Sequence, residues 1–228
     1  MNATRSLRWV GQLIYKDFYV LRGSMLFVGV LGLVVPFLTT RLDQGWLFLG
    51  MWTGLTGYFF AISSCTYEET VGGWRWMRTL PVSARTIMLA KYAANLLFAL
   101  VSSGVLTLIG QVMASRGWLP APAVPVYYYT FFPMPMVLVF GGLVMWLSVA
   151  WDFRRAQIAF YVFMLAIMLL PGFGKLFGAD RPRWAEQWAT GDLHFHLTTA
   201  SWLFLAGLLA LYAVFGLLAA RAFARRDL

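Results

Sequence analysis

Charged side chains and cysteine are both scarce in this sequence. Only 12% of the residues are charged and 61% are hydrophobic, whereas a typical soluble domain is about 25% charged and about 45–50% apolar. A soluble globule of this length could not bury so much apolar surface in one core, so the composition predicts one integral membrane domain over residues 1–228. Cys65 is the only cysteine, which excludes an internal disulfide and a cysteine-based metal site.

The motifs of common hydrolytic enzymes are also missing. The sequence contains no G-x-x-x-x-G-K-[ST] phosphate loop, no H-E-x-x-H zinc motif and no G-x-S-x-G nucleophile motif. We therefore expect no catalytic residue, no metal and no cofactor in this chain. If ATP drives the protein, the ATPase must be a separate subunit.

Ionisable residues are lacking in the middle of the apolar stretches. Lys91 and Lys175 lie near the ends of such stretches, where we expect their long side chains to reach the membrane interface. Transporters that use an ion gradient normally carry intramembrane ionisable groups, so another energy source is expected here. The net charge of +9 comes from short segments between apolar runs, a pattern typical of a topology signal and not of nucleic-acid binding.

Six continuously apolar stretches predict an all-α membrane protein with six transmembrane helices. A spanning helix needs about 20 residues, with a range of about 17–25, and a β-barrel strand would instead alternate apolar and polar residues. The first stretch is barely long enough. The stretches are residues 24–40, 46–66, 87–114, 128–150, 156–177 and 198–220.

Lysine and arginine are concentrated on one side of this predicted layout. The side of the two termini carries Arg5, Arg8, Lys16, Arg22, Arg75, Arg78, Arg85, Lys91, Arg154, Arg155, Arg221, Arg225 and Arg226. The other side carries Arg41, Arg116, Lys175, Arg181 and Arg183. Because positive connections stay in the cytoplasm, both termini are predicted to be cytoplasmic.

Three segments outside the spans are expected to matter. Residues 1–23 form an amphipathic interfacial helix, with apolar residues at helical spacing: Leu7, Val10, Ile14, Phe18 and Leu21. Residues 67–85 are the longest cytoplasmic connection. Residues 178–197 are the longest extracytoplasmic connection.

Two of these segments carry a family resemblance. Residues 14–22 read Ile-Tyr-Lys-Asp-Phe-Tyr-Val-Leu-Arg, and the connection contains Tyr67-Glu68-Glu69-Thr70, Gly72-Gly73-Trp74-Arg75 and Leu80-Pro81-Val82-Ser83, with Arg85 and Lys91 following. Together they resemble the ABC-2 permeases, the transmembrane subunits of ATP-binding cassette exporters. In that family an elbow helix precedes the first span, and a coupling helix with a Leu-Pro-[Val/Ile]-Ser turn links spans two and three.

The resemblance implies a set of partners. These are an ABC ATPase subunit in two copies, which holds ATP and Mg²⁺, and a second permease half, expected as a homodimer. The expected location is a bacterial cytoplasmic (inner) membrane, where the complex would export its cargo. The elbow helix would contribute Lys16, Asp17 and Arg22, and the ATPase-coupling residues would be Glu68, Glu69, Trp74, Arg75, Arg78 and Pro81.

Residue chemistry agrees with a docking helix in this connection. Val71, Trp74, Met77 and Leu80 recur at a spacing of three, which leaves Arg75 and Arg78 on another face. Pro81 is placed to separate two helices, and Ser83 to cap the second one. The alternative is an interfacial amphipathic loop that only holds the topology.

The second span is expected to line the transport path, as the resemblance implies. Trp52, Tyr58 and Phe59 would make that path suitable for a hydrophobic or amphipathic cargo, such as a peptide, a drug-like molecule or a lipid. Alternatively these rings face lipid or neighbouring helices. Small residues at Gly50, Gly54 and Gly57 predict close helix packing, between two subunits or within one.

Two other classes of function compete with transport. His194 and His196 could support a membrane-embedded enzyme that acts on lipid or peptide at the outer face. A channel or passive scaffold is the third possibility, although no selectivity-filter sequence or ring of charges supports it.

Overall fold

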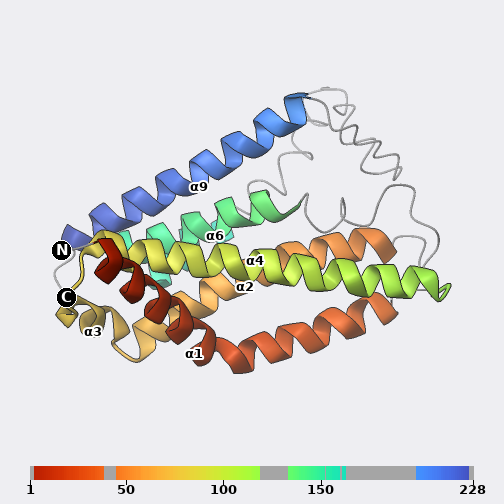
Figure 1. The fold of residues 1–228 in the computed structure, drawn as a ribbon, viewed down its shortest axis with the longest axis horizontal. Coiled ribbons are helices and arrows are strands. Elements are labelled where there is room, and N and C mark those ends of the chain that lie inside the picture. The colour runs from red at the N-terminus through yellow and green to blue at the C-terminus, as the bar shows by residue number, and fades with distance from the viewer. Residues whose placement is uncertain are drawn as a thin grey trace.

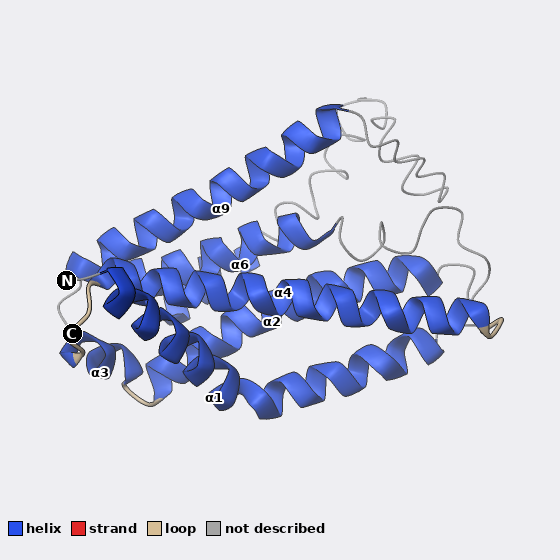
Figure 2. Cartoon of the chain, in the orientation of Figure 1, coloured by secondary structure: helices blue, strands red, loops and turns tan. Residues whose placement is uncertain are grey.

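The computed structural model describes residues 3–38, 45–118, 133–151, 153–159, 161–162 and 199–225, and the described residues contain no strand. The long helices are α1 (Ala3–Leu38), α2 (Gly45–Thr70), α4 (Ala84–Ser115), α6 (Pro133–Ala150) and α9 (Thr199–Arg225). The short helix α3 (Gly73–Thr79) lies between α2 and α4 (Figures 1 and 2). The all-helical class is therefore confirmed for these residues.

The number of membrane spans is only partly settled by these helices. By length and composition, Ala84–Ser115 and Leu205–Arg225 are the described helices able to cross a membrane, and Leu138–Ala150 is a shorter apolar helix. Most of the predicted fifth span, residues 156–177, lies outside the described residues, as does the connection 178–197. The six-span layout stays a prediction.

Helix α1 begins and α9 ends at the same end of the bundle as α3 (Figure 1).

Helix α1 contains both the predicted elbow and the predicted first span. It runs without interruption from Ala3 to Leu38 and changes direction part-way along (Figure 1). Leu13 and Leu21 are buried and Tyr15 is exposed, so the elbow has the amphipathic character that its sequence predicts. The helix also buries Asp17, which the apolar spacing did not predict.

Helix α4 forms the centre of the bundle, because it contacts α1, α2, α6 and α9. Tyr92 on α4 donates a hydrogen bond to the carbonyl oxygen of Gly142 at 2.7 Å, and Tyr212 on α9 donates one to the carbonyl oxygen of Tyr92 at 2.8 Å. These bonds join three helices and satisfy two buried hydroxyl groups, which would be costly to leave unpaired.

Candidate functional site

The connection between α2 and α4 contains two turns with clear local causes. Gly72 adopts a φ of 67° and a ψ of 23°, a left-handed conformation that glycine takes without the steric cost a side chain would add. Leu80 is extended, as the residue before a proline prefers to be, and α3 ends at Thr79. Ser83 then caps α4, because its hydroxyl oxygen accepts a hydrogen bond from the backbone N–H of Thr86 at 3.2 Å.

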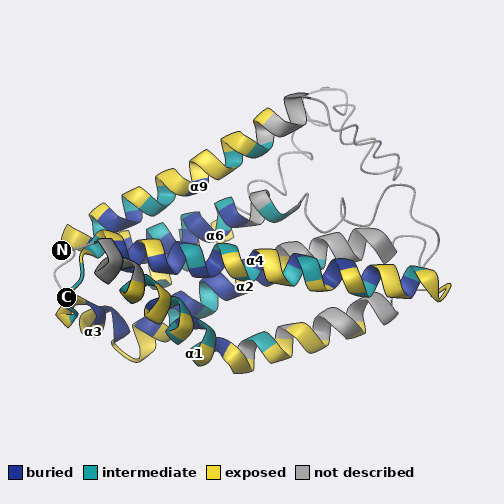
Figure 3. Ribbon diagram, viewed as in Figure 1, coloured by how far each residue is buried: buried dark blue, intermediate teal, exposed yellow. Residues whose placement is uncertain are grey.

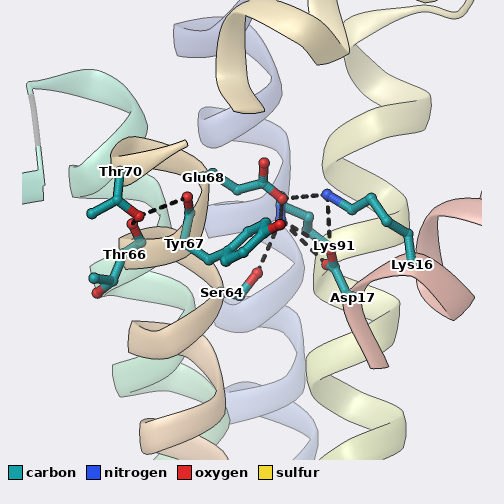
Figure 4. Close-up of polar contacts among 8 residues, drawn as sticks. All are labelled: Lys16, Asp17, Ser64, Thr66, Tyr67, Glu68, Thr70 and Lys91. Atoms are coloured by element: carbon teal, nitrogen blue, oxygen red, sulfur yellow. Dashed lines mark hydrogen bonds and ion pairs between the residues drawn. The ribbon is translucent and has the colours of Figure 1, made fainter. Parts of the chain in front are cut away.

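Four charged side chains from three helices meet at one place (Figure 4). The amine of Lys91 on α4 lies 2.9 Å from Glu68 Oε1 on α2 and 3.2 Å from Asp17 Oδ2 on α1. It also donates a hydrogen bond to Ser64 Oγ at 2.9 Å. The amine of Lys16 contacts Glu68 Oε1 and lies 3.3 Å from Asp17 Oδ1. We call Lys16, Asp17, Glu68 and Lys91 the ion cluster.

The ion cluster is electrically balanced, and all of its members except the partly exposed Lys16 are buried. Lys91 is 3% exposed and Glu68 is 1% exposed, and the two lysines offset the two carboxylates. Removing charges from water costs several kcal/mol per ion, so such a cluster persists only where the partners compensate one another. Losing one member would leave an uncompensated buried charge. The cluster therefore fixes how α1, α2 and α4 pack.

Helix α3 rests on the ion cluster. An added Cβ at Gly73 would lie 1.8 Å from Glu68 Oε2, so the backbone of α3 lies directly against that carboxylate. The same oxygen has no hydrogen-bond partner among the described residues. The Lys91 amine lies 5.3 Å from the centre of the Trp74 ring, a cation–π contact.

The end of α9 holds the other side of α3. The rings of Trp74 and Phe223 are 5.7 Å apart, and Arg78 donates a hydrogen bond to the carbonyl oxygen of Ala224 at 3.1 Å. Helix α3 is thus tied to α2 and α4 through the ion cluster and to α9 through Phe223. A displacement of α3 would therefore strain its contacts with α2, α4 and α9.

The predicted coupling residues divide into two groups in the structure. Glu69, Arg75, Arg78 and Pro81 are exposed, whereas Glu68 and Trp74 are buried. Trp74 and Met77 are buried together on the face of α3 that their spacing predicts to be apolar, and the coupling role of the six residues stays a prediction. Glu68 faces inward because both lysines of the ion cluster need its carboxylate, and Trp74 packs between Lys91 and Phe223.

The three predicted elbow residues lie in different surroundings, and Lys91 differs from what the sequence indicated. Asp17 is buried in the ion cluster, Lys16 is partly exposed, and the exposed Arg22 lies over the Tyr19 ring at 4.5 Å. The interpretation that Lys91 reaches the membrane interface is wrong, since two carboxylates hold its amine inside the bundle. The contacts join residues 23, 52 and 74 positions apart, which explains why no local motif revealed them. The available signal was opposite charge at the same predicted membrane depth.

A separate apolar groove lies between α1, α2 and α4. Its volume is about 430 Å³, and its lining includes Met25, Trp52, Phe98 and Val105. Phe59 lines a shallow depression that shares Met25, Thr56 and Phe98 with this groove. Tyr58 lines neither feature. Of the predicted path residues, Trp52 and Phe59 therefore share a face of α2, and Tyr58 lies on another.

The small residues of α2 pack within this chain where they are described. Gly57 is buried, and its carbonyl oxygen lies 3.9 Å from the position of a Cβ added at Gly141 on α6. The same added Cβ would lie 3.2 Å from the Cβ of Ala61. Gly50 and Gly54 lie in α2, but their surroundings fall outside what the structure describes.

Metal-binding groups and the two histidines bear on the alternative of an enzyme. Within the described residues, no three His, Cys, Asp or Glu side chains could hold one metal ion. His194 and His196 lie outside the described residues. The outer-face enzyme therefore stays an untested alternative.

Comparison with known families decides the class of this protein. The family described as ABC-2 family transporter protein matches residues 12–222, which include the ion cluster, α3, the second half of the elbow and most of α9. The chain belongs to the ABC-2 transporter family. Members of this family are the membrane subunits of ABC transporters and work with ABC ATPase subunits. Among curated proteins, no sequence matches the chain.

Proposed function

We propose that this ABC-2 protein is the permease subunit of an ATP-driven exporter in a bacterial cytoplasmic membrane. A separate ABC ATPase, in two copies, binds and hydrolyses ATP with Mg²⁺. The permease works as a homodimer with both termini in the cytoplasm. Helix α3 is the element that the ATPase moves.

The observation that carries this proposal is that α3 has one exposed face and one face packed against the helix bundle. Its outward face offers Arg75 and Trp76 to solvent, while its inward face rests on Glu68, Lys91 and Phe223. Arginine and tryptophan are frequent anchors of protein interfaces. A soluble partner bound to the outward face would therefore act on α2, α4 and α9 through contacts that are already formed.

The ion cluster makes the connection from α3 to the long helices rigid. The amine of Lys91 lies within hydrogen-bond distance of Asp17 and Glu68, and all three are buried, a setting in which breaking a single pair is strongly destabilising. Rigid-body displacement of the helices then costs less than separating the charges. A push on α3 is expected to move the cluster end of α1, α2 and α4 together.

The groove between α1, α2 and α4 supports a hydrophobic or amphipathic cargo. Its lining is apolar apart from Thr56, Ser102 and the Trp52 ring nitrogen, which has no hydrogen-bond partner in the part of the chain described. Its volume lies within the range of about 300–1,000 Å³ typical of small-molecule sites. A peptide, a drug-like molecule or a lipid would fit this chemistry.

The test is co-purification from the native membrane in mild detergent, followed by an ATPase assay. Wild-type chain is expected to carry an ATPase subunit with a phosphate-loop motif. Arg75→Glu reverses the charge of an exposed α3 residue and is expected to reduce the retained ATPase about tenfold, equivalent to about 1.4 kcal/mol.

Arg116→Glu is the matched control, because Arg116 is also exposed and follows the opposite end of α4. It should leave the ATPase bound. A wild-type chain that purifies alone would overturn the proposal and make the outer-face enzyme the next hypothesis to test. Equal loss from both variants would overturn the role of α3.

A further inference from the structure

A second groove lies on another side of the bundle, between α4 and α9. It has a volume of about 470 Å³. Figure 1 shows α9 approaching α4 toward the end that carries α3, and the two helices are in contact. The lining residues on α4 are Arg85, Leu89, Tyr92, Ala93 and Leu96, and those on α9 are Tyr212, Ala213, Gly216, Leu217 and Ala220.

The rings of Tyr92 and Tyr212 form the floor of this α4–α9 groove, and both of their hydroxyl groups are hydrogen-bonded. Tyr92 and Tyr212 direct their hydroxyl groups to backbone carbonyl oxygens, so both rings present carbon atoms to the groove. An added Cβ at Gly216 would lie 3.3 Å from the Tyr92 ring, which shows that α9 sits tightly on this floor. Leu89 and Leu217 are 61% and 60% exposed and lie along the groove.

One end of the α4–α9 groove carries a positive charge. Arg85 lines it, is exposed, and forms no ion pair with any residue that the structure describes. The other lining residues are uncharged. The α4–α9 groove is therefore apolar along its length and has one cationic group at one end.

The length of the groove matches one leaflet of a bilayer. Arg85 and Leu96 are eleven positions apart on α4, which corresponds to about 16 Å along a helix. One leaflet of the hydrocarbon core is about 15 Å deep, half of about 30 Å. A chain that entered beside Arg85 would end near the membrane midplane.

We propose that the α4–α9 groove binds one anionic phospholipid, with an acyl chain along the groove and the phosphate beside Arg85. The lipid belongs to the cytoplasmic leaflet, a placement that rests on the orientation in the proposed function. Charge selects the headgroup, because a basic residue at a cytoplasmic membrane surface attracts anionic lipid. The small side chain of Ala213 leaves space in the groove for the acyl chain.

Native mass spectrometry of the full-length chain tests this site. The chain, purified in mild detergent, is titrated with phosphatidylglycerol or with phosphatidylcholine of the same acyl chains. We expect one phosphatidylglycerol to bind with preference over phosphatidylcholine. Arg85→Gln should weaken that binding about fivefold, and Arg85→Lys should retain most of it.

Two matched pairs separate the groove from general surface charge. Arg75→Gln removes an exposed arginine that does not line the groove, and it should leave lipid binding unchanged. Ala213→Phe fills the groove and should abolish the bound lipid. Val214→Phe, one position along α9 and outside the lining, should not.

Equal binding of both lipids, or equal losses from Arg85→Gln and Arg75→Gln, would overturn the proposal. Disulfide cross-linking of an Ala213→Cys variant to a second copy would also overturn it, since another chain would then occupy the groove. None of these readouts needs ATP or the ATPase. Failure of the lipid site is thus distinguishable from failure of the proposed function.

Discussion

The two halves of α4 are buried to different extents. The half that follows α3 buries Ile87, Lys91, Tyr92 and Asn95 among α1, α2, α6 and α9. The other half exposes large apolar residues to the outside: Val101, Val105, Leu108 and Val112. Figure 3 shows the buried residues of α4 concentrated toward the α3 end.

This difference suggests that the two halves of α4 have different roles. The packed half holds a balanced set of charges that resists rearrangement, which suits the transmission of force from α3. The open half borders the apolar groove with Trp52, which suits contact with lipid or cargo. If the packed half is the stiffer one, substitutions there should cost more stability than matched substitutions in the open half.

Lys91→Met should have the largest effect. It leaves the Asp17 and Glu68 carboxylates buried with only Lys16 as a cationic partner, and breaking a buried ion pair in this way costs about 3–5 kcal/mol. Denaturant unfolding of the detergent-solubilised chain measures the loss. Arg116→Met removes an exposed charge at the other end of α4 and should change the free energy of unfolding by less than about 0.5 kcal/mol.

A second substitution shows whether charge balance is the cause. Asp17→Asn combined with Lys91→Met leaves the Lys16–Glu68 pair and restores neutrality, so part of the lost stability should return. If the double variant were less stable than Lys91→Met alone, the loss would come from packing and not from an unpaired carboxylate.

Gly73→Ala should have the next largest effect. Its Cβ would lie 1.8 Å from Glu68 Oε2, so α3 or the carboxylate must move, at a cost of about 1–3 kcal/mol. Gly104→Ala is the contrast in the open half of α4, because nothing lies within 4 Å of the added Cβ. That substitution should stabilise the helix by about 0.5–1 kcal/mol. Thermal unfolding of both variants would show opposite signs, and a shared sign would contradict the close seating of α3.

Ser83→Ala should have the smallest effect of the three. It removes the hydroxyl group that caps the packed end of α4, which typically costs about 1 kcal/mol. Ser115→Ala at the open end removes only a bond to the carbonyl oxygen of Val112 on an exposed surface and should be close to neutral. Equal losses from the two variants, measured by the same unfolding assay, would show that the two ends of α4 are equally dependent on their serines.

Local features of the fold were predictable from sequence. The amphipathic elbow, the proline turn and the Ser83 cap each depend on residues within one or two helical turns. The short helix α3 was also expected in the connection that contains Pro81. The family resemblance, carried by those same segments, is confirmed by the match over residues 12–222.

The ion cluster was not predictable in the same way. Lys16, Asp17, Glu68 and Lys91 were each noted separately, but their pairing depends on how α1, α2 and α4 pack. Helical periodicity reports which face is apolar and cannot state which distant charges meet. The burial of Glu68, which the local sequence pattern did not predict, has the same origin.

The most direct test of the account is site-specific cross-linking from α3. Cys65, the only cysteine, is fully buried, so a cysteine placed at Arg75 would be the only accessible thiol and could carry a photoactivatable cross-linker. In native membranes we predict that Arg75→Cys cross-links to an ABC ATPase subunit and that Arg116→Cys does not. Adducts to lipid alone from Arg75→Cys, with the ATPase present in the same membranes, would contradict the claim that α3 receives the force of ATP hydrolysis.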